Sequence, residues 1–339
     1  MPVRRKRAPS LASSYRRALS QWTRLAHSSL NTGRRAAGQA VALNKAAARQ
    51  SVPVAGGAWL SGVAMGPAGM RRFRLYRPPG VGLGERRPLL VMLHGCGQDA
   101  GGFALSTRMN RIAAREGCFV LYPEQDRSAH PHGCWHWYGT RSGQAQREAT
   151  TLAAAIDQVC LLYAVDATRV AIAGLSAGAS MAALMVIREP ARFCALVMHS
   201  GIAPGMADSS MTALKAMRGR SVQAAPAVTG PLWPPLLVIH GDADGVVAAS
   251  NGAAMAQYWA EQAGALGQAS REVRRGRRRA MTVTDYKAHG RLVASLCRVE
   301  GLGHAWSGGD ARQQFGDAQG PDASRMVWSF AARQFRTRA

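Results

Sequence analysis

Short, uninterrupted runs of apolar residues alternate with helix-like segments along most of this chain, and this alternation constrains the fold more than any other feature. The apolar runs lie at residues 88–93, 118–122, 170–173, 195–199 and 236–240. Such runs are typical of strands that are buried on both faces of a sheet. The segments between them that suit helices are 103–116, 145–163 and 179–187. Strands that alternate with helices predict an α/β fold with a mostly parallel central sheet and helices on both faces.

The two ends of the alternating region are also recognisable. Residues 70–76 alternate enough to predict an edge strand, which ends before Pro78. Residues 292–299 predict the last strand and residues 325–335 a closing helix. We therefore expect two parts, a basic N-terminal arm with its linker at residues 1–55 and a catalytic domain at residues 56–339.

A serine lies between two glycines at the end of a predicted strand. The segment Gly174-Leu-Ser-Ala-Gly178 follows the apolar run 170–173 and precedes a predicted helix. A nucleophilic serine of this kind sits on a strained turn, where a side chain at either glycine would collide with the neighbouring strand or helix. Ser176 is therefore the candidate nucleophile.

A serine nucleophile needs a base and an acidic residue that orients the base, and both are expected after later strands. Two carboxylates, Asp242 and Asp244, follow the strand at 236–240. We select Asp244 because it lies deeper in the loop, and we expect Asp242 to shape the turn. The last strand leads into a glycine-flanked loop that carries His304. His304 is the candidate base.

An oxyanion hole requires two backbone N–H groups. We expect one from Ala177, the residue after the serine, and the other from Cys96 in the loop His94-Gly-Cys-Gly97. A serine, an acid, a histidine and this loop in the required order predict a serine hydrolase with the α/β-hydrolase fold.

With these residues in place, the chain resembles the esterases of the polyhydroxybutyrate (PHB) depolymerase family, which also contains feruloyl and acetyl-xylan esterases. The matching segments are 93–99, 122–125, 134–138, 174–179, 240–244, 303–309 and 320–324. The resemblance implies a triad of Ser176, Asp244 and His304 and ester hydrolysis through an acyl-enzyme. It implies no metal and no organic cofactor.

A loop rich in aromatic residues departs from the family pattern. The family commonly has Asn and Phe where this chain has His136 and Tyr138. We expect Trp135, Trp137, Tyr138 and Trp306 to form an apolar substrate-binding wall beside the serine. Because the departure lies in this loop, the acyl specificity stays open.

Two cysteines lie in loops near the expected site. Cys96 adjoins the expected oxyanion hole, and Cys134 begins the aromatic loop. The resemblance makes a disulfide between them plausible, and two separate thiols are the alternative in a reducing cytosol.

The chain is strongly basic, with 43 Lys and Arg against 19 Asp and Glu and a net charge of +24. Residues 1–50 hold eleven basic residues and no acidic one, and residues 271–279 hold six arginines with Glu272. Both segments lie outside the segments that carry the resemblance. The arm could lie as a basic helix on an anionic membrane or granule surface, or it could pack on the enzyme. We expect no specific nucleic-acid partner.

No apolar run approaches the roughly 20 residues of a membrane-spanning helix. Arg16, Arg17 and Arg24 interrupt any secretion signal, which favours a cytoplasmic protein, although relatives in the family are often extracellular. The expected substrates are small or oligomeric esters, in particular short-chain or oligomeric hydroxyalkanoate esters. The alternatives are a feruloyl- or acetyl-xylan-type esterase and, from another class, a polyanion- or granule-binding protein with an idle hydrolase core.

Overall fold

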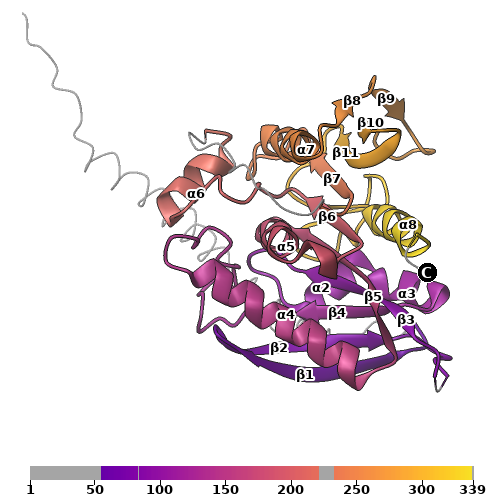
Figure 1. Cartoon of the computed structure of the whole chain (residues 1–339). Helices are drawn as coiled ribbons and strands as arrows, with labels where there is room; N and C mark the ends of the chain where they lie inside the picture. Colours follow the sequence, from indigo (N-terminus) through magenta and orange to yellow (C-terminus); the bar gives the residue numbers. More distant parts are fainter. Residues whose placement is uncertain (1–54, 83, 221–232, 338–339) are drawn as a thin grey trace, which may run out of the picture. The chain divides into compact units, whose positions relative to one another are not determined.

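The structure is a computed structural model that describes residues 55–82, 84–220 and 233–337. Its main sheet has the strand order β1-β2-β4-β3-β5-β6-β7-β11-β10-β8, and β9 pairs with β10 (Figure 1). The strands are β1 Ala58–Gly66, β2 Gly69–Arg77, β3 Arg87–Leu93, β4 Phe119–Pro123, β5 Val165–Leu175, β6 Ala195–His199, β7 Leu236–Gly241, β8 Leu266–Gly267, β9 Arg271–Val273, β10 Met281–Ala288 and β11 Arg291–Val299. From β4 to β11 every neighbouring pair is parallel, whereas β1, β2 and β10 pair antiparallel.

Helices cover the sheet on both faces. They are α2 Ala100–Thr107, α3 Met109–Glu116, α4 Gln144–Leu162, α5 Ala177–Arg188, α6 Ser210–Met217, α7 Ser250–Gln262 and α8 Ala323–Phe335. Alternate residues of β3 enter different clusters, because successive side chains of a strand point to opposite faces. Leu89 and Val91 join the core formed with α4, α5 and α7, and Leu90 and Met92 join the core formed with α2, α3 and α8. This architecture confirms the predicted α/β-hydrolase fold.

Two predicted elements need correction. Residues 70–76 form part of β2, but β2 lies between β1 and β4 and is not the edge strand. β1 was missed because it is half-exposed and rich in Gly and Ala, so it lacks a clear apolar pattern. The predicted helix 103–116 is divided into α2 and α3 at Arg108, whose φ of 53° is left-handed.

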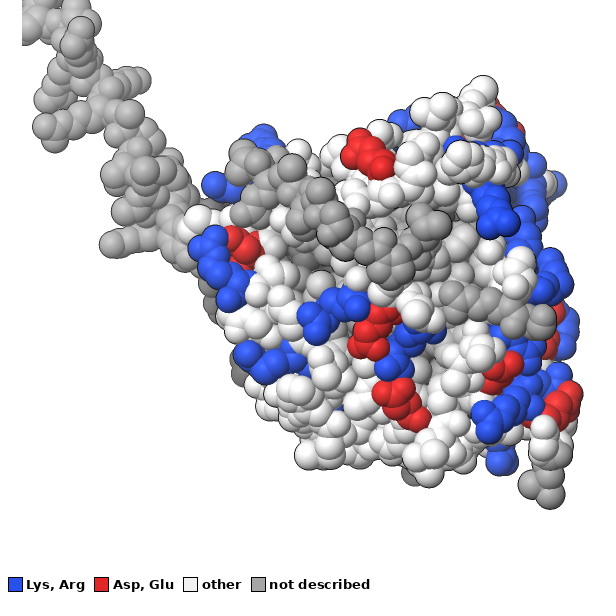
Figure 2. All heavy atoms as spheres, in the orientation of Figure 1, with Lys and Arg blue, Asp and Glu red and all other residues white. Residues whose placement is uncertain are grey.

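The predicted arm, residues 1–55, lies outside the described residues except for its last residue. Among the helices that the structure describes, none has the length and apolar character needed to cross a membrane. Two short strands, β12 Trp306–Ser307 and β13 Gly316–Asp317, pair after β11. On the face shown in Figure 2, Lys and Arg side chains gather along the side where Figure 1 places β9, β10 and α8.

Candidate active site

Ser176 lies at the turn between β5 and α5 with φ 56° and ψ −122°, a strained conformation for a residue with a side chain. A Cβ at Gly174 would collide with the backbone of Gly178, which belongs to the helix. A Cβ at Gly178 would collide with the carbonyl oxygens of Leu93 and His94 at the end of β3. The two glycines therefore allow strand, turn and helix to pack closely enough to form this turn.

The buried Asp244 carboxylate makes a short hydrogen bond to His304. The Nδ1 atom of His304 lies 2.8 Å from Oδ2 of Asp244, and the Asp244 side chain has no exposed surface. The other carboxylate oxygen accepts hydrogen bonds of 2.9 Å from the amides of Val246 and Val247. The Nε2 atom of His240 lies 3.5 Å from the same Oδ2 atom of Asp244. These contacts fix the orientation of the His304 ring.

Burial of the Asp244 carboxyl raises its pKa, but the hydrogen bonds from His240 and His304 outweigh burial and hold the pKa well below its usual range. Asp244 is therefore an ionised partner for His304. Asp242 is exposed and accepts a hydrogen bond of 2.7 Å from the amide of Gly301. This contact joins the turn after β7 to the loop that leads to His304.

His199 connects the serine turn with the histidine loop. The amide of Ser176 donates a 2.8 Å hydrogen bond to the carbonyl of His199. The amide of Ser307 donates a 3.1 Å hydrogen bond to Nε2 of the same residue. Ser307 follows His304 by three residues, so one buried histidine joins both loops. The sequence pattern alone gave no sign of this link.

The amides of Cys96 and Ala177 are available as hydrogen-bond donors. Ala177 is the first residue of α5, where an amide has no partner within its own helix. Among the described residues, neither amide donates a hydrogen bond to another protein group. The loop that carries Cys96 is held next to the aromatic loop, because the amide of Gly97 donates a 2.7 Å hydrogen bond to the carbonyl of His132. A disulfide joins Cys96 to Cys134 across the same two loops.

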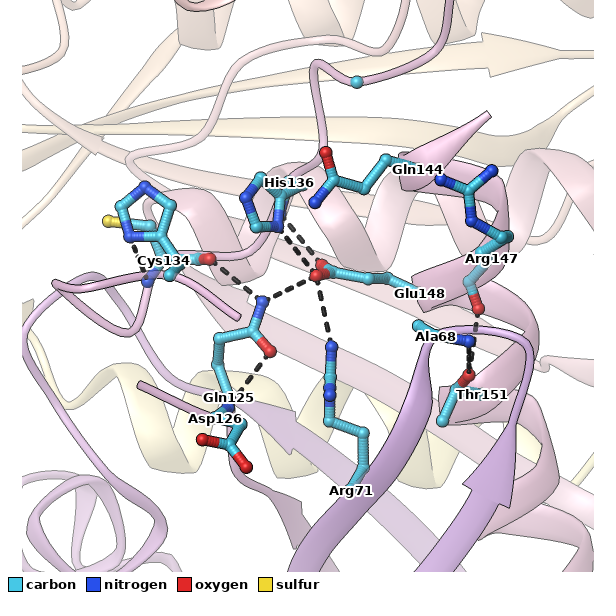
Figure 3. A network of polar contacts seen from close by, with 12 residues as sticks. Ala68, Arg71, Gln125, Asp126, Cys134, His136, Gln144, Arg147, Glu148 and Thr151 are labelled. Carbon is cyan, nitrogen blue, oxygen red and sulfur yellow. Dashed lines mark hydrogen bonds and ion pairs between the residues drawn. The ribbon is translucent and has the colours of Figure 1, made fainter. Parts of the chain in front are cut away.

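A buried polar network centred on Glu148 of α4 holds the aromatic loop in place (Figure 3). Glu148 accepts a 2.9 Å hydrogen bond from the amide of His136 and a 2.7 Å hydrogen bond from its ring. Gln125 donates to Glu148 at 2.8 Å and to the carbonyl of Cys134 at 3.0 Å. Arg71 of β2 approaches the same carboxylate at 3.3 Å.

Burial raises the pKa of Glu148, but its hydrogen bonds from His136 and Gln125 have the larger combined effect, and the pKa lies below its usual range. Sequence reasoning missed this residue. The signal was a carboxylate on the apolar side of a helix, beside the buried Ala145, Ala149 and Leu152. A charge in such a position is normally paired.

The prediction that Trp135 and Trp306 belong to an apolar substrate-binding wall is wrong. Trp135 has no exposed surface, and its indole N–H donates a 2.9 Å hydrogen bond to the carbonyl of His94. Trp306 is also fully buried and donates to the hydroxyl of Ser324 at 3.0 Å. Both side chains belong to the core, because apolar rings with satisfied N–H groups pack favourably there.

The other two aromatic residues of the expected wall lie nearer the surface. Trp137 is 6% exposed and meets the half-buried Tyr138 edge to face, with ring centroids 5.5 Å apart. Their role in substrate binding stays a prediction. No group of His, Cys, Asp and Glu side chains suited to a metal ion occurs in the described part of the chain.

Comparisons with known proteins identify the family. A family model described as esterase PHB depolymerase matches residues 71–282, well over half of the chain. This match includes the arginine run 271–279, so placing that run outside the resemblance was wrong.

Poly(3-hydroxyalkanoate) depolymerase C of Paucimonas lemoignei is 27% identical over 52% of this chain and 45% of its own length. Acetylxylan esterase A of Emericella nidulans is 24% identical over 56% of this chain and 66% of its own length. The chain thus spans about half to two thirds of these curated relatives. An acetyl xylan esterase from Aspergillus awamori shares the fold, with a TM-score of 0.62 and 17% identity over 73% of this chain and 94% of that one. The chain belongs to the esterase PHB depolymerase family.

Proposed function

We propose that this protein is a serine esterase that hydrolyses carboxylic esters through an acyl-enzyme, with Ser176, His304 and Asp244 as its catalytic triad. The observation that carries the proposal is the 2.8 Å contact between the buried Asp244 carboxylate and Nδ1 of His304. This contact leaves Nε2 of His304 as the nitrogen that can accept a proton. The strained turn at Ser176 gives independent support.

In this mechanism the Ser176 hydroxyl oxygen attacks the ester carbonyl carbon while Nε2 of His304 takes the hydroxyl proton. Asp244 stabilises the imidazolium that forms. The amides of Cys96 and Ala177 donate hydrogen bonds to the oxyanion of the tetrahedral intermediate. Collapse of this intermediate breaks the bond to the alcohol oxygen, which takes the proton from His304. Water, deprotonated by His304, then attacks the acyl carbon of the acyl-enzyme. Collapse of this second tetrahedral intermediate breaks the bond to the Ser176 oxygen, which takes the proton back from His304 as the acid leaves.

The proposed substrates are short-chain or oligomeric hydroxyalkanoate esters. The family membership and the similarity to a poly(3-hydroxyalkanoate) depolymerase support this class. A second candidate is an acetyl ester of a carbohydrate, because an acetylxylan esterase is similar over a comparable part of the chain. Both candidates use the same triad and differ only in the pocket.

The test is hydrolysis of p-nitrophenyl esters from C2 to C12 by the wild type and by Ser176→Ala. We expect Ser176→Ala to lose at least roughly a thousandfold in kcat. Ser270→Ala is the matched control, because Ser270 is exposed and precedes β9, and it should keep the wild-type rate. Near-wild-type turnover in Ser176→Ala would overturn the mechanism.

Hydroxybutyrate oligomers, acetylated xylan and methyl ferulate, assayed in parallel, distinguish the substrate classes. A kcat/KM that is highest for the oligomers supports the hydroxyalkanoate assignment, and one highest for acetylated xylan supports the second candidate. A wild type that hydrolyses none of these esters but binds polyanions in a salt-sensitive way would instead favour a binding protein with an idle hydrolase core.

A further inference from the structure

The arginine run 271–279 lies beside an apolar sheet face that the proposed mechanism does not use. Cross-strand partners in a sheet share a face. Val273 of β9 pairs with Met281 of β10, and Val283 of β10 pairs with both Arg271 of β9 and Cys297 of β11. These five side chains therefore share one face, on which an apolar patch borders an arginine.

Helix α8 forms the opposite side of a groove over this face. Arg325, Met326, Phe330 and Arg333 recur at the spacing that places residues on one side of a helix, and all four line the groove. The hollow has a volume of about 680 Å³, which falls in the range of small-molecule sites. It shares no lining residue with the candidate active site.

The groove is positively charged. Its lining contains five arginines and two aspartates, namely Arg271, Arg275, Arg278, Arg325, Arg333, Asp285 and Asp322. Asp285 pairs with Arg271 at 2.6 Å and Asp322 with Arg325 at 3.4 Å. Within the described residues, Arg275, Arg278 and Arg333 form no ion pair, and Arg278 donates a 2.6 Å hydrogen bond to the carbonyl of Gly320. Three cations in the groove thus lack a carboxylate partner.

A second, adjacent hollow extends the positive charge. It has a volume of about 240 Å³, shares Arg278, Asp322 and Arg325 with the groove, and adds Arg108, Arg111 and Arg115. Figure 2 shows basic side chains crowded along this side of the molecule. Charge complementarity therefore requires an anionic occupant.

The chain itself does not supply that occupant. Residues 1–50 carry eleven basic residues and no acidic one, and a second copy of the chain carries the same net charge of +24. The phosphates of a nucleic acid would pair with the arginines. They would not cover the apolar floor of the groove, which is formed by the apolar side chains of β9 and β10. The only aromatic ring in the described lining, Phe330, is 1% exposed and offers no surface for base stacking.

An apolar floor beneath arginines suits a molecule with an acyl chain and an anionic head. We propose that this groove binds a free carboxylic acid that carries an acyl chain. The acyl chain of this ligand covers the half-buried Val273 and Met326, and its carboxylate bonds to Arg275 and Arg333. Arginine suits this role because its planar fork matches a carboxylate. The small volume favours a free acid over a lipid held in a bilayer.

The experiment measures dodecanoate binding to the full chain by isothermal titration calorimetry, below the micellar concentration. The variant is Arg275→Glu with Arg333→Glu, and the control is Arg188→Glu with Arg127→Glu, two exposed arginines outside the groove. We expect the dissociation constant to rise at least about tenfold in the groove variant and to stay unchanged in the control. Circular dichroism melting checks that both variants are folded.

Three probes test the chemistry of the ligand. Dodecyltrimethylammonium carries the same chain with a cationic head, butyrate carries the head with a short chain, and phosphatidylglycerol vesicles present an anionic bilayer. We expect dodecyltrimethylammonium and butyrate to bind at least about tenfold more weakly than dodecanoate. Vesicle binding should be the same in the wild type and the groove variant, because residues 1–50 are expected to bind anionic vesicles. Equal dodecanoate affinity in the groove variant and wild type, or binding to vesicles without binding to dodecanoate, would overturn the proposal. The measurement involves no turnover, so its outcome is independent of the proposed esterase function.

Discussion

His199 is fully buried, and its ring lies between the hydroxyl of Ser200 and the amide of Ser307. Its Nε2 accepts a hydrogen bond from the amide of Ser307, and its Nδ1 lies 3.2 Å from the hydroxyl of Ser200. A neutral ring with a proton on Nδ1 satisfies both contacts. A second proton, on Nε2 of His199, would point at the amide N–H of Ser307, so two donors would face each other. Burial, together with the nearby His240 and His304, lowers the pKa of His199 to about 3.

This low pKa predicts a stability that depends on pH. The unfolded chain takes up a proton on this histidine near pH 6.5, whereas the folded chain takes it up near pH 3. Between these values the unfolded state binds more protons, so the free energy of unfolding decreases as the pH falls. We expect His199 to contribute a slope of up to about 1.4 kcal/mol per pH unit between pH 6 and pH 4.

Urea denaturation at pH 7, 6, 5 and 4 measures this slope. His199→Asn should be less stable than wild type at pH 7 but should lose less stability on acidification. His289→Asn is the control, because His289 is exposed with a left-handed φ of 49° that asparagine tolerates. Parallel curves for His199→Asn and wild type would contradict the prediction.

The position of the expected oxyanion loop depends on helix α4 and strand β2, which lie far from each other in the sequence. The disulfide ties Cys96 to Cys134, and the amide of His136, two residues further along, donates to Glu148 of α4. Helix α4 packs against β1 and β2, where Arg71 reaches the same carboxylate. We therefore expect Glu148 to be a positioning residue that acts on the expected oxyanion loop through the aromatic loop.

Glu148→Gln tests this role. The substitution removes the charge that faces Arg71, and breaking a buried ion pair costs about 3 kcal/mol of unfolding free energy. We expect kcat for p-nitrophenyl butyrate to fall about tenfold with little change in KM, because a displaced oxyanion donor weakens transition-state binding. We measure kcat and KM separately, at a temperature at which the variant is fully folded.

A double variant separates position from stability. Arg71→Met with Glu148→Gln removes both charges, so we expect it to recover much of the stability. Its kcat should stay low, because His136 still lacks its carboxylate partner. Full recovery of kcat along with stability would show that Glu148 has only a structural role.

Across the molecule, two parts are rich in positive charge: the N-terminal arm, by its sequence, and the groove between β9–β11 and α8. The arm contributes eleven basic residues without an acid. We propose that it associates with anionic surfaces, since clusters of Lys and Arg attract anionic lipid. The groove has the size of a small-molecule site and serves a different ligand class.

Deletion of residues 1–50 tests the role of the arm. We expect the shortened chain to keep wild-type p-nitrophenyl butyrate hydrolysis and to lose co-sedimentation with phosphatidylglycerol vesicles. Phosphatidylcholine vesicles are the neutral control, and binding of the full chain should weaken as salt increases. Equal co-sedimentation of both chains would rule out the arm as the binding element.

The order of the central strands and the candidates for chemistry could be predicted from local sequence patterns. Apolar runs specify buried strands because both faces of a parallel sheet exclude water, and the glycines around Ser176 reflect a turn that admits no side chain at those positions. Asp244 and His304 could be selected as candidates because each follows the carboxyl end of a predicted strand.

The buried groups that support those candidates became visible only in the folded chain. The contacts of Glu148 with His136 and of His199 with Ser307 join residues from different elements, and no local pattern records them. The same holds for Trp135 and Trp306, which belong to the core, and for the groove beside α8. Whether an aromatic ring or an arginine faces solvent, a ligand or the interior depends on how distant elements pack, because burial is a property of the assembled sheet and its helices.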